Sequence, residues 1–144
     1  MNDKISTRDH NVDVLSALGF DRVQNTTIFK KGDQFILSPA VSESTNGTYW
    51  FDVREVNLNR ISNDSLLLVR IVPNLFIIEN LKKIPSLFSK QIMDNRPNSG
   101  NVWGIHIKIN KISKNAFLFN VKKSNNRILT RLLNREEIID YFNS

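Results

Sequence analysis

Three stretches of the chain, residues 49–54, 103–109 and 116–123, alternate in a pattern typical of β-strands with one buried face. The alternation predicts that these side chains point into the core: Tyr49, Phe51 and Val53, then Trp103, Ile105, Ile107 and Ile109, then Phe117, Phe119 and Val121. The opposite face of the first strand then carries Trp50, Asp52 and Arg54, and that of the second carries His106 and Lys108.

Five further strands are predicted from apolar runs and from the turns between them. Residues 26–31 and 34–41 flank Lys31-Gly32-Asp33, which indicates a hairpin. The very apolar runs at 66–72 and 75–78 are separated by Pro73-Asn74 and predict two central strands joined by a tight turn. Residues 127–132 give the last strand.

Three segments have helical spacing. Residues 9–18 predict a first helix, with Gly19 as a left-handed stop and Phe20 folding back onto its apolar face. Residues 81–92 predict a second helix that begins near Pro85. Asn134 and Glu137 form a capping box, so a short terminal helix is predicted over residues 135–142. Residues 56–61 fit more than one structure, and residues 93–101 are predicted to be a loop.

This order of elements predicts an α+β fold in a single domain over residues 1–144. We expect a mostly antiparallel sheet or a partly closed barrel of about seven to eight strands. It would carry an N-terminal helix, a mid-chain helix and a short C-terminal helix.

Composition narrows the functional classes. The chain has 144 residues, of which 40% are hydrophobic, enough for one core. It contains no cysteine, which excludes disulfides, thiolate metal sites and thiol nucleophiles. The polar N-terminus lacks the apolar segment of a secretory signal, and the apolar runs are too short to cross a membrane. A cytoplasmic protein with no membrane partner is therefore expected.

The positive charge is concentrated in one part of the chain. Residues 80–135 hold twelve Lys or Arg against one acid, Asp94, although the whole chain has a net charge of only +6. Such an excess repels itself unless something negative lies against it. Nucleic acid is the usual partner, and an acidic protein or a plain solvated surface are the alternatives.

The predicted strands place these cations on one face and in two turns. Lys108 shares a strand face with His106, and Arg127 and Arg131 share another. Lys111 and Lys114 lie in one turn. Basic side chains can reach phosphates while neighbouring amides reach base edges. The candidate nucleic-acid-binding residues are Lys108, Lys111, Lys114, Lys122, Lys123, Arg127, Arg131, Asn110, Asn125 and Asn126.

Aromatic side chains would favour single-stranded nucleic acid, because bases stack on them. The alternation assigns Trp103, Phe117 and Phe119 to the core, so a single-strand-specific module is not favoured. No helix-turn-helix pattern with a basic recognition helix is present either. We therefore expect strands and loops to contact the nucleic acid.

Catalytic motifs are scarce. His10 and His106 have no second histidine at ligand spacing, and no nucleotide-binding glycine motif occurs. A helix followed by three strands, with Asp33, Asp52 and Glu55 as carboxylates, resembles the layout of PD-(D/E)XK nucleases, although Arg54 stands where that family has lysine. The resemblance implies a Mg²⁺ ion held by these carboxylates.

The sequence therefore favours a nucleic-acid-binding module, above all a DNA-binding one, without its own catalysis or cofactor. In a restriction-modification or regulatory system it would be the recognition part. One alternative is a small divergent Mg²⁺-dependent nuclease, and the other is an adaptor that binds an acidic protein.

Overall fold

The structure, a computed structural model, describes residues 13–44, 47–71 and 74–143. It has the predicted α+β fold, and its strands form two mostly antiparallel sheets. His10, the predicted helix start at residues 9–12, Asn46 and Pro73 lie outside the described residues.

The first sheet, which we call sheet A, has the strand order β1-β2-β3-β6-β7. Its strands are β1 (Asp21–Arg22), β2 (Ile28–Lys31), β3 (Gln34–Leu37), β6 (Leu66–Ile71) and β7 (Leu75–Asn80). The second, sheet B, has the order β11-β10-β9-β5-β4, and β8 also pairs with β9. Its strands are β4 (Ser42–Glu43), β5 (Thr48–Arg54), β8 (Asp94–Arg96), β9 (Gly100–Asn110), β10 (Asn115–Asn120) and β11 (Ile128–Arg131).

The prediction of one sheet or a partly closed barrel of seven to eight strands is wrong in these details. The described residues form eleven strands in two sheets, and the sheets do not close into a barrel. The unforeseen strands β1, β4 and β8 have only two or three residues, too few to show an alternating pattern. The sheets meet at an antiparallel bridge, where the backbones of Phe76 and Leu133 exchange hydrogen bonds of 2.7 and 2.8 Å.

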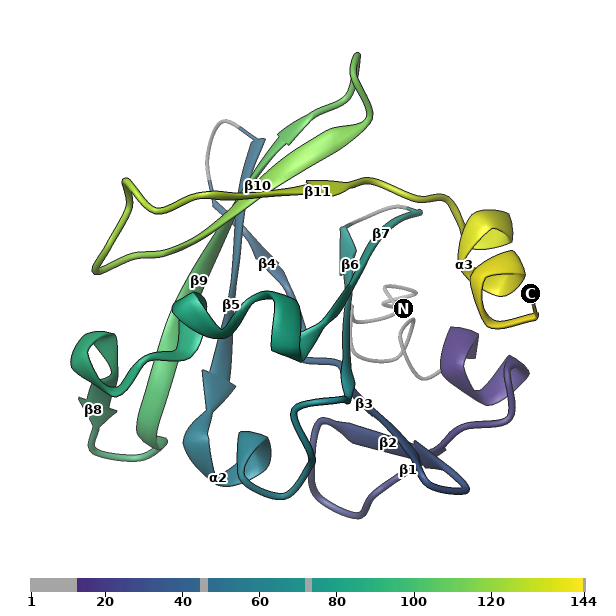
Figure 1. Cartoon of the computed structure of the whole chain (residues 1–144), viewed down its shortest axis with the longest axis horizontal. Helices are drawn as coiled ribbons and strands as arrows, with labels where there is room; N and C mark the ends of the chain where they lie inside the picture. Colours follow the sequence, from purple (N-terminus) through teal and green to yellow (C-terminus); the bar gives the residue numbers. More distant parts are fainter. Residues whose placement is uncertain (1–12, 45–46, 72–73, 144) are drawn as a thin grey trace, which may run out of the picture.

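Sheet A is the middle layer of the molecule (Figure 1). One of its faces packs against sheet B, with Leu67, Val69 and Ile77 in the same cluster as Phe51 and Ile105. The other face packs against helical segments at both ends of the described chain, with contributions from Leu68 and Phe76 of sheet A and from Leu15 and Ile138. Burial on both faces explains why β6 and β7 are continuous apolar runs rather than alternating ones.

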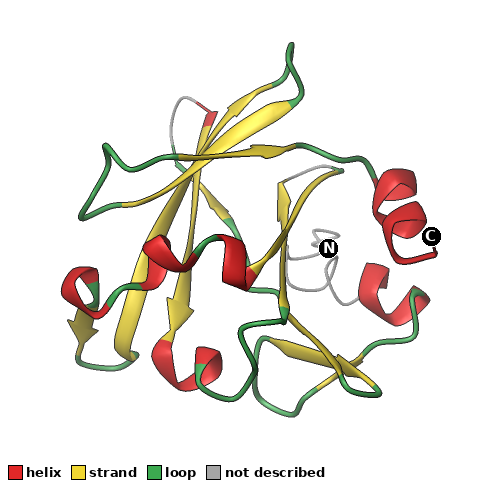
Figure 2. Cartoon of the chain, viewed as in Figure 1, coloured by secondary structure: helices red, strands yellow, loops and turns green. Residues whose placement is uncertain are grey.

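The predicted mid-chain helix at residues 81–92 is wrong. Three short 3₁₀ helices replace it: η2 (Leu81–Lys83), η3 (Pro85–Phe88) and η4 (Lys90–Ile92). Figure 2 shows them in red between β7 and β8. A proline disfavours helical backbone at the residue before it. Ile84, which precedes Pro85, adopts φ −129° and ψ 35°. Leu81, Ile84 and Leu87 are buried at every third position, which is the period of a 3₁₀ helix.

Both helix-end predictions are confirmed. Residues 13–17 are helical, and Gly19 follows with φ +90°. The N–H of Phe20 donates to the carbonyl of Leu15, and that of Gly19 donates to Ser16, as in a Schellman motif. At the other end, helix α3 (Arg135–Asn143) begins with the predicted capping box. The N–H of Glu137 donates to Asn134 Oδ1 at 2.9 Å, and the N–H of Asn134 donates to Glu137 Oε1 at 3.0 Å.

Several other elements follow the sequence closely. The hairpin β2–β3 turns at Gly32 and Asp33, and β6 pairs with β7 as predicted. Residues 128–131 form a strand and not the start of a long helix. The ambiguous segment at 56–61 contains most of the short helix α2 (Glu55–Leu58).

Candidate nucleic-acid interface

Sheet B has one face against sheet A and one face toward solvent. Strand β9 shows this division clearly, because Trp103, Ile105 and Ile107 are buried while Lys108 is exposed. We call the solvent side of β5, β9, β10 and β11 the outer face. It carries Trp50, His106, Lys108, Phe117, Phe119, Leu129 and Arg131, together with Arg127, which precedes β11.

The strand register arranges these side chains in rows across the sheet. One row runs through Trp50, His106 and Phe119, and the next runs through Lys108, Phe117 and Leu129. In the first row the rings of His106 and Phe119 are 5.6 Å apart between centroids. The guanidinium of Arg127 lies over the Phe119 ring at 4.5 Å, within cation–π range.

The prediction that Phe117 and Val121 point into the core is wrong, whereas Phe119 is buried as predicted, although on the other side of the sheet. Pairing of Leu118 with Ile107 and of Ala116 with Ile109 turns the even-numbered residues of β10 inward. Phe117 is 39% exposed and Val121 is 44% exposed, whereas Phe119 lies on the outer face beneath Arg127 at 8% exposure. Trp103 is in the core, as predicted. The aromatic rings that the alternation had assigned to the core therefore include two on the outer face.

Sequence reasoning also missed Trp50 as a candidate contact residue. Its side chain is 37% exposed in the middle of β5. The alternation of residues 49–54 had placed it on the polar face with Asp52, so the pattern already indicated its exposure. The signal in the sequence is a tryptophan whose neighbour on the same strand face, Asp52, is polar.

The predicted basic residues lie on the outer face and at both ends of it. Lys111 and Lys114 are in the turn between β9 and β10, which projects from the molecule in Figure 1. Lys122 and Lys123 are in the connection between β10 and β11, near Asn125 and Asn126. The two turns are separated by the six residues of β10, a length of about 20 Å. Together with Lys108, Arg127 and Arg131, they form an extended basic surface.

Most of these cations are not neutralised within the protein. Among the described residues, no carboxylate lies within 4.0 Å of the charged groups of Lys108, Lys111, Lys114, Lys123 or Arg127. Lys122 differs, because its Nζ is 3.1 Å from Asp94 Oδ1. Arg131 Nη2 is 3.8 Å from Glu137 Oε2, but the Arg131 side chain is 79% exposed. Five charges are thus available to an anionic partner, and the other two are partly offset.

The asparagines predicted to contact nucleic acid differ in their exposure and hydrogen bonds. Asn110 Oδ1 accepts hydrogen bonds from the N–H groups of Ile112 and Ser113, so this oxygen holds the turn. Asn125 is exposed and Asn126 is half-buried in the β10–β11 connection. Asn120 is only 1% exposed and serves the core instead.

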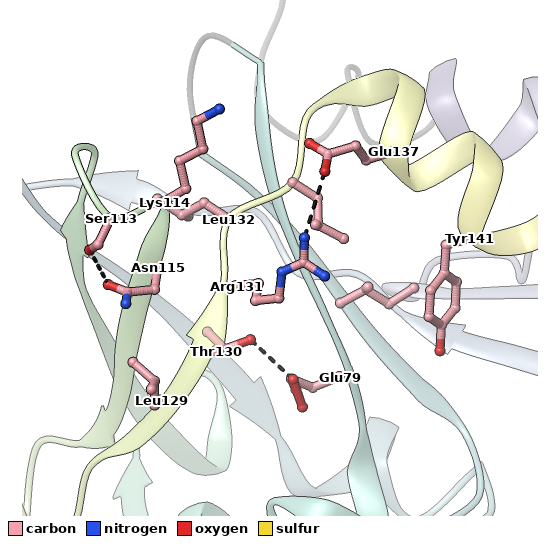
Figure 3. A pocket seen from close by; sticks show the side chains of 12 residues that line it. Glu79, Ser113, Lys114, Asn115, Leu129, Thr130, Arg131, Leu132, Glu137 and Tyr141 are labelled. Carbon is pink, nitrogen blue, oxygen red and sulfur yellow. Dashed lines mark hydrogen bonds and ion pairs between the residues drawn. The ribbon is translucent and has the colours of Figure 1, made fainter.

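A groove of about 590 Å³ lies beside the outer face, between β7, β11, the β9–β10 turn and α3 (Figure 3). Lys114 and Arg131 line it, but so do Glu79 and Glu137. Thr130 Oγ1 donates to Glu79 Oε1 at 3.1 Å. Because acids and bases alternate there, the groove is a boundary of the basic surface and not its centre.

A second boundary is formed by an ion-pair network of Asp52, Asp94, Arg96 and Lys122 beside Gly104. Arg96 Nη1 donates to Asp52 Oδ2 at 2.6 Å, and Arg96 also lies 3.6 Å from Asp94. Gly104 pairs with Asp52, and a Cβ there would lie 3.7 Å from both Asp52 Oδ1 and Arg96 Nη2. Arg96 and Asp52 thus meet directly above the Gly104 position. The ion-pair partner of Asp52 is Arg96, which lies 44 residues further along the chain.

These contacts shift two pKa values. The hydrogen bond from Lys122, followed by its charge, lowers the pKa of Asp94. The hydrogen bond to Asp52 raises the pKa of Arg96 above its usual value. Both groups therefore remain charged across the neutral range, and the pair Asp52–Arg96 ties β5 to β8 across β9.

The Asp52→Ala substitution is expected to destabilise the fold by about 1–2 kcal/mol, because a charge-assisted hydrogen bond is lost in a partly solvated site. Urea unfolding measures this change. The Asp64→Ala variant is the control, since the Asp64–Lys82 pair is 71% and 57% exposed and its loss should cost less than about 0.5 kcal/mol. Mg²⁺-dependent nicking of a plasmid by the wild type that Asp52→Ala abolishes at unchanged stability would instead favour the nuclease alternative.

The other two carboxylates of the nuclease alternative, Asp33 and Glu55, lie in different surroundings from Asp52. Asp33 is in the β2–β3 turn of sheet A, whereas Asp52 is in sheet B. Glu55 begins α2 and accepts a hydrogen bond from Asn101 at 3.1 Å. In the described part of the chain, no three His, Cys, Asp or Glu side chains are close enough to hold a metal ion. The structure thus does not bring the three carboxylates together as a metal-holding group.

No family model, curated protein or solved structure matches this chain. None of the helices in the described residues has the length and apolar character needed to cross a membrane. The site must therefore be interpreted from its own chemistry.

Proposed function

We propose that this protein binds nucleic acid through the outer face of sheet B and the two basic turns at its ends. The observation that carries the proposal is the set of five cations without acidic partners on this surface. They surround an exposed sheet face about 20 Å long, which suits a polyanion that is itself extended. A small anion would need convergent cations instead.

In its proposed function, the protein is a binding module without its own catalysis. DNA is the expected ligand from the sequence, and a role as the recognition part of a restriction-modification or regulatory system follows that expectation. Phosphate contacts would hold the ligand in place, and side chains between them would contact bases. The ion-pair network around Asp52 and the mixed groove at Glu79 and Glu137 would limit the footprint on two sides.

Binding is expected to weaken steeply as salt is raised. With five to seven phosphate contacts, the logarithm of the association constant should fall against the logarithm of salt concentration with a slope of about −4 to −6. Fluorescence anisotropy of labelled single-stranded and double-stranded oligonucleotides between low and moderate salt measures this slope. A flat response would show that phosphates are not the main partner and would favour a different ligand for the basic surface.

A further inference from the structure

We infer that the nucleic acid bound at the outer face is single-stranded, and that its bases stack on the rings of Trp50 and Phe117. The inference rests on the proposed function, because it takes the basic surface as a phosphate-binding site. It adds the form of the ligand and the side chains that contact the bases. The observations that support it are the exposure of the two rings, their spacing and the charges around them.

Both rings are available on the solvent side of regular strands. Trp50 is 37% exposed and Phe117 is 39% exposed, each within a hydrogen-bonded strand of sheet B. Large aromatic side chains usually contribute to cores or interfaces, where their area leaves water. Aromatic rings presented by a sheet within a basic surface are the platform on which unpaired bases stack, whatever their sequence.

The strand register sets the distance between the two rings. They project from β5 and β10, with β9 between them, and Phe117 is one row further along the sheet. Strand spacing and residue rise place them about 12 Å apart. Lys108 and His106 lie on β9 between them. One base can stack at each ring while Lys108 contacts a phosphate of the intervening backbone.

Arg127 extends this platform. Its guanidinium covers Phe119, which is why Phe119 is nearly buried, and Arg127 itself is exposed. A guanidinium on a ring presents a flat, charged surface, which can stack on a base and attract a phosphate. The row of Trp50, His106 and Phe119 with Arg127 is therefore cationic at one end and aromatic at the other.

A duplex fits these features less well. Its bases are stacked on each other inside the helix, so only their edges and the phosphates are accessible to a protein. The rings of Trp50 and Phe117 would then have nothing to stack on. A duplex would more readily take the projecting β9–β10 hairpin into its major groove, a binding mode that uses Lys111 and Lys114 and leaves Trp50 free of contact.

Tryptophan fluorescence tests the inference directly. The chain has two tryptophans, and Trp103 is 3% exposed with its Nε1 bonded to the Ser89 carbonyl. Quenching by added oligonucleotide would thus report on Trp50. We expect oligothymidylate and oligouridylate to quench the emission, and the Trp50→Phe variant, which keeps Trp103, to lose the quenching. Oligodeoxyuridylate compared with oligouridylate, which differ only in the sugar, distinguishes DNA from RNA as the natural source.

Matched variants test Phe117. The Phe117→Leu variant should bind single strands at least about 5-fold more weakly, which corresponds to the lower limit for stacking on one ring. The Val56→Ala variant is the control, because Val56 is an aliphatic side chain on α2, outside the outer face, and is 45% exposed. It should change the affinity less than about 2-fold. A thermal melt of each variant checks the fold, and the wild-type quenching decides the question if Phe117→Leu does not fold.

The outcomes separate the inference from the function on which it rests. Salt-dependent binding that is as tight for a duplex as for a single strand, with no quenching, would overturn base stacking but support nucleic-acid binding. Absence of binding to any of these oligonucleotides at low salt would overturn both and leave an acidic protein as the partner. Quenching by single strands, with a weaker and non-quenching duplex, supports both.

Discussion

The double substitution Lys108→Glu and Arg127→Glu is expected to lower nucleic-acid affinity by two orders of magnitude or more at moderate salt. Lys108 is exposed on β9, and among the described residues neither side chain has a carboxylate partner. Removing two phosphate contacts should make the salt slope shallower by about two. The two new carboxylates add repulsion toward the remaining phosphates. Anisotropy titrations across a salt series measure both effects.

Stability should change little in this variant. Among the described residues, the Lys108 side chain makes no hydrogen bond or ion pair. Arg127 would lose its exposed hydrogen bond to the Ser124 carbonyl and its cation–π contact with Phe119, the latter worth about 0.5–1 kcal/mol at an exposed site. Urea unfolding checks that the fold persists. If the double variant also unfolded, its loss of binding would not show where the nucleic acid binds. A control variant with the same change in charge is therefore needed.

The control is the double substitution Lys83→Glu and Lys90→Glu, which makes the same change in net charge. Both lysines are exposed and belong to η2 and η4. The neighbouring η3 segment packs on the inward side of sheet B, where Asn120 donates to the Leu87 carbonyl and Trp103 donates to the Ser89 carbonyl. The control charges therefore belong to the 3₁₀ segments that cover the inward side of sheet B. If the control weakens binding as much as the test variant, the outer face is not the site.

The Asn120→Ala substitution is expected to destabilise the protein by about 2–3 kcal/mol, because one buried carbonyl and one partly buried N–H lose their partners. Asn120 Nδ2 donates to the Leu87 carbonyl at 2.9 Å, and Asn120 Oδ1 accepts from the N–H of Lys122 at 2.9 Å. The side chain thus joins the end of β10 to η3 and fixes the start of the basic connection. Urea unfolding measures the change, and Asn125→Ala in the same connection should cost less than about 0.5 kcal/mol.

A second variant shows whether the hydrogen bond to Leu87 matters. In Asn120→Asp, a buried carboxylate oxygen faces the Leu87 carbonyl, and burial favours the protonated form, which can donate. Its pKa in the folded state is then raised above the unfolded value. Stability should therefore be highest below the ordinary pKa of Asp and fall as pH rises toward neutrality. Equal stability of this variant and the wild type at neutral pH would contradict the role assigned to Asn120.

The sequence was sufficient where a local rule determined the structure. The helix ends at Gly19 and Asn134 follow from backbone conformation and capping, which involve residues within five positions of each other. The strands β5 and β9 follow from a contrast between their two faces, with Phe51 inward and Asp52 outward, or Ile107 inward and Lys108 outward. The concentration of cations in residues 80–135 is likewise a property of the sequence alone.

The direction of β10 depended on the tertiary structure. Residues 116–121 are apolar on both faces except for Asn120, so the alternation gives no polarity contrast between the two faces of the strand. The sequence pattern therefore assigned the larger Phe side chains to the core. Pairing of Leu118 with Ile107 decides the direction, together with the bond from Asn120 to η3. These partners are 11 and 33 residues away in the chain. The exposed position of Phe117, on which the base-stacking proposal depends, therefore could not be obtained from local pattern.

Local pattern was enough for the α+β class, most strands, the two helix ends and the concentration of positive charge in residues 80–135. The tertiary structure decided the division into two sheets, the replacement of the mid-chain helix by 3₁₀ turns and the residues that share the outer face. The physical reason is the range of the interactions involved. Turns, caps and charge density act within a few residues, whereas the parallel pairing of β3 with β6 and the register of β5 on β9 join segments that are about thirty to sixty residues apart.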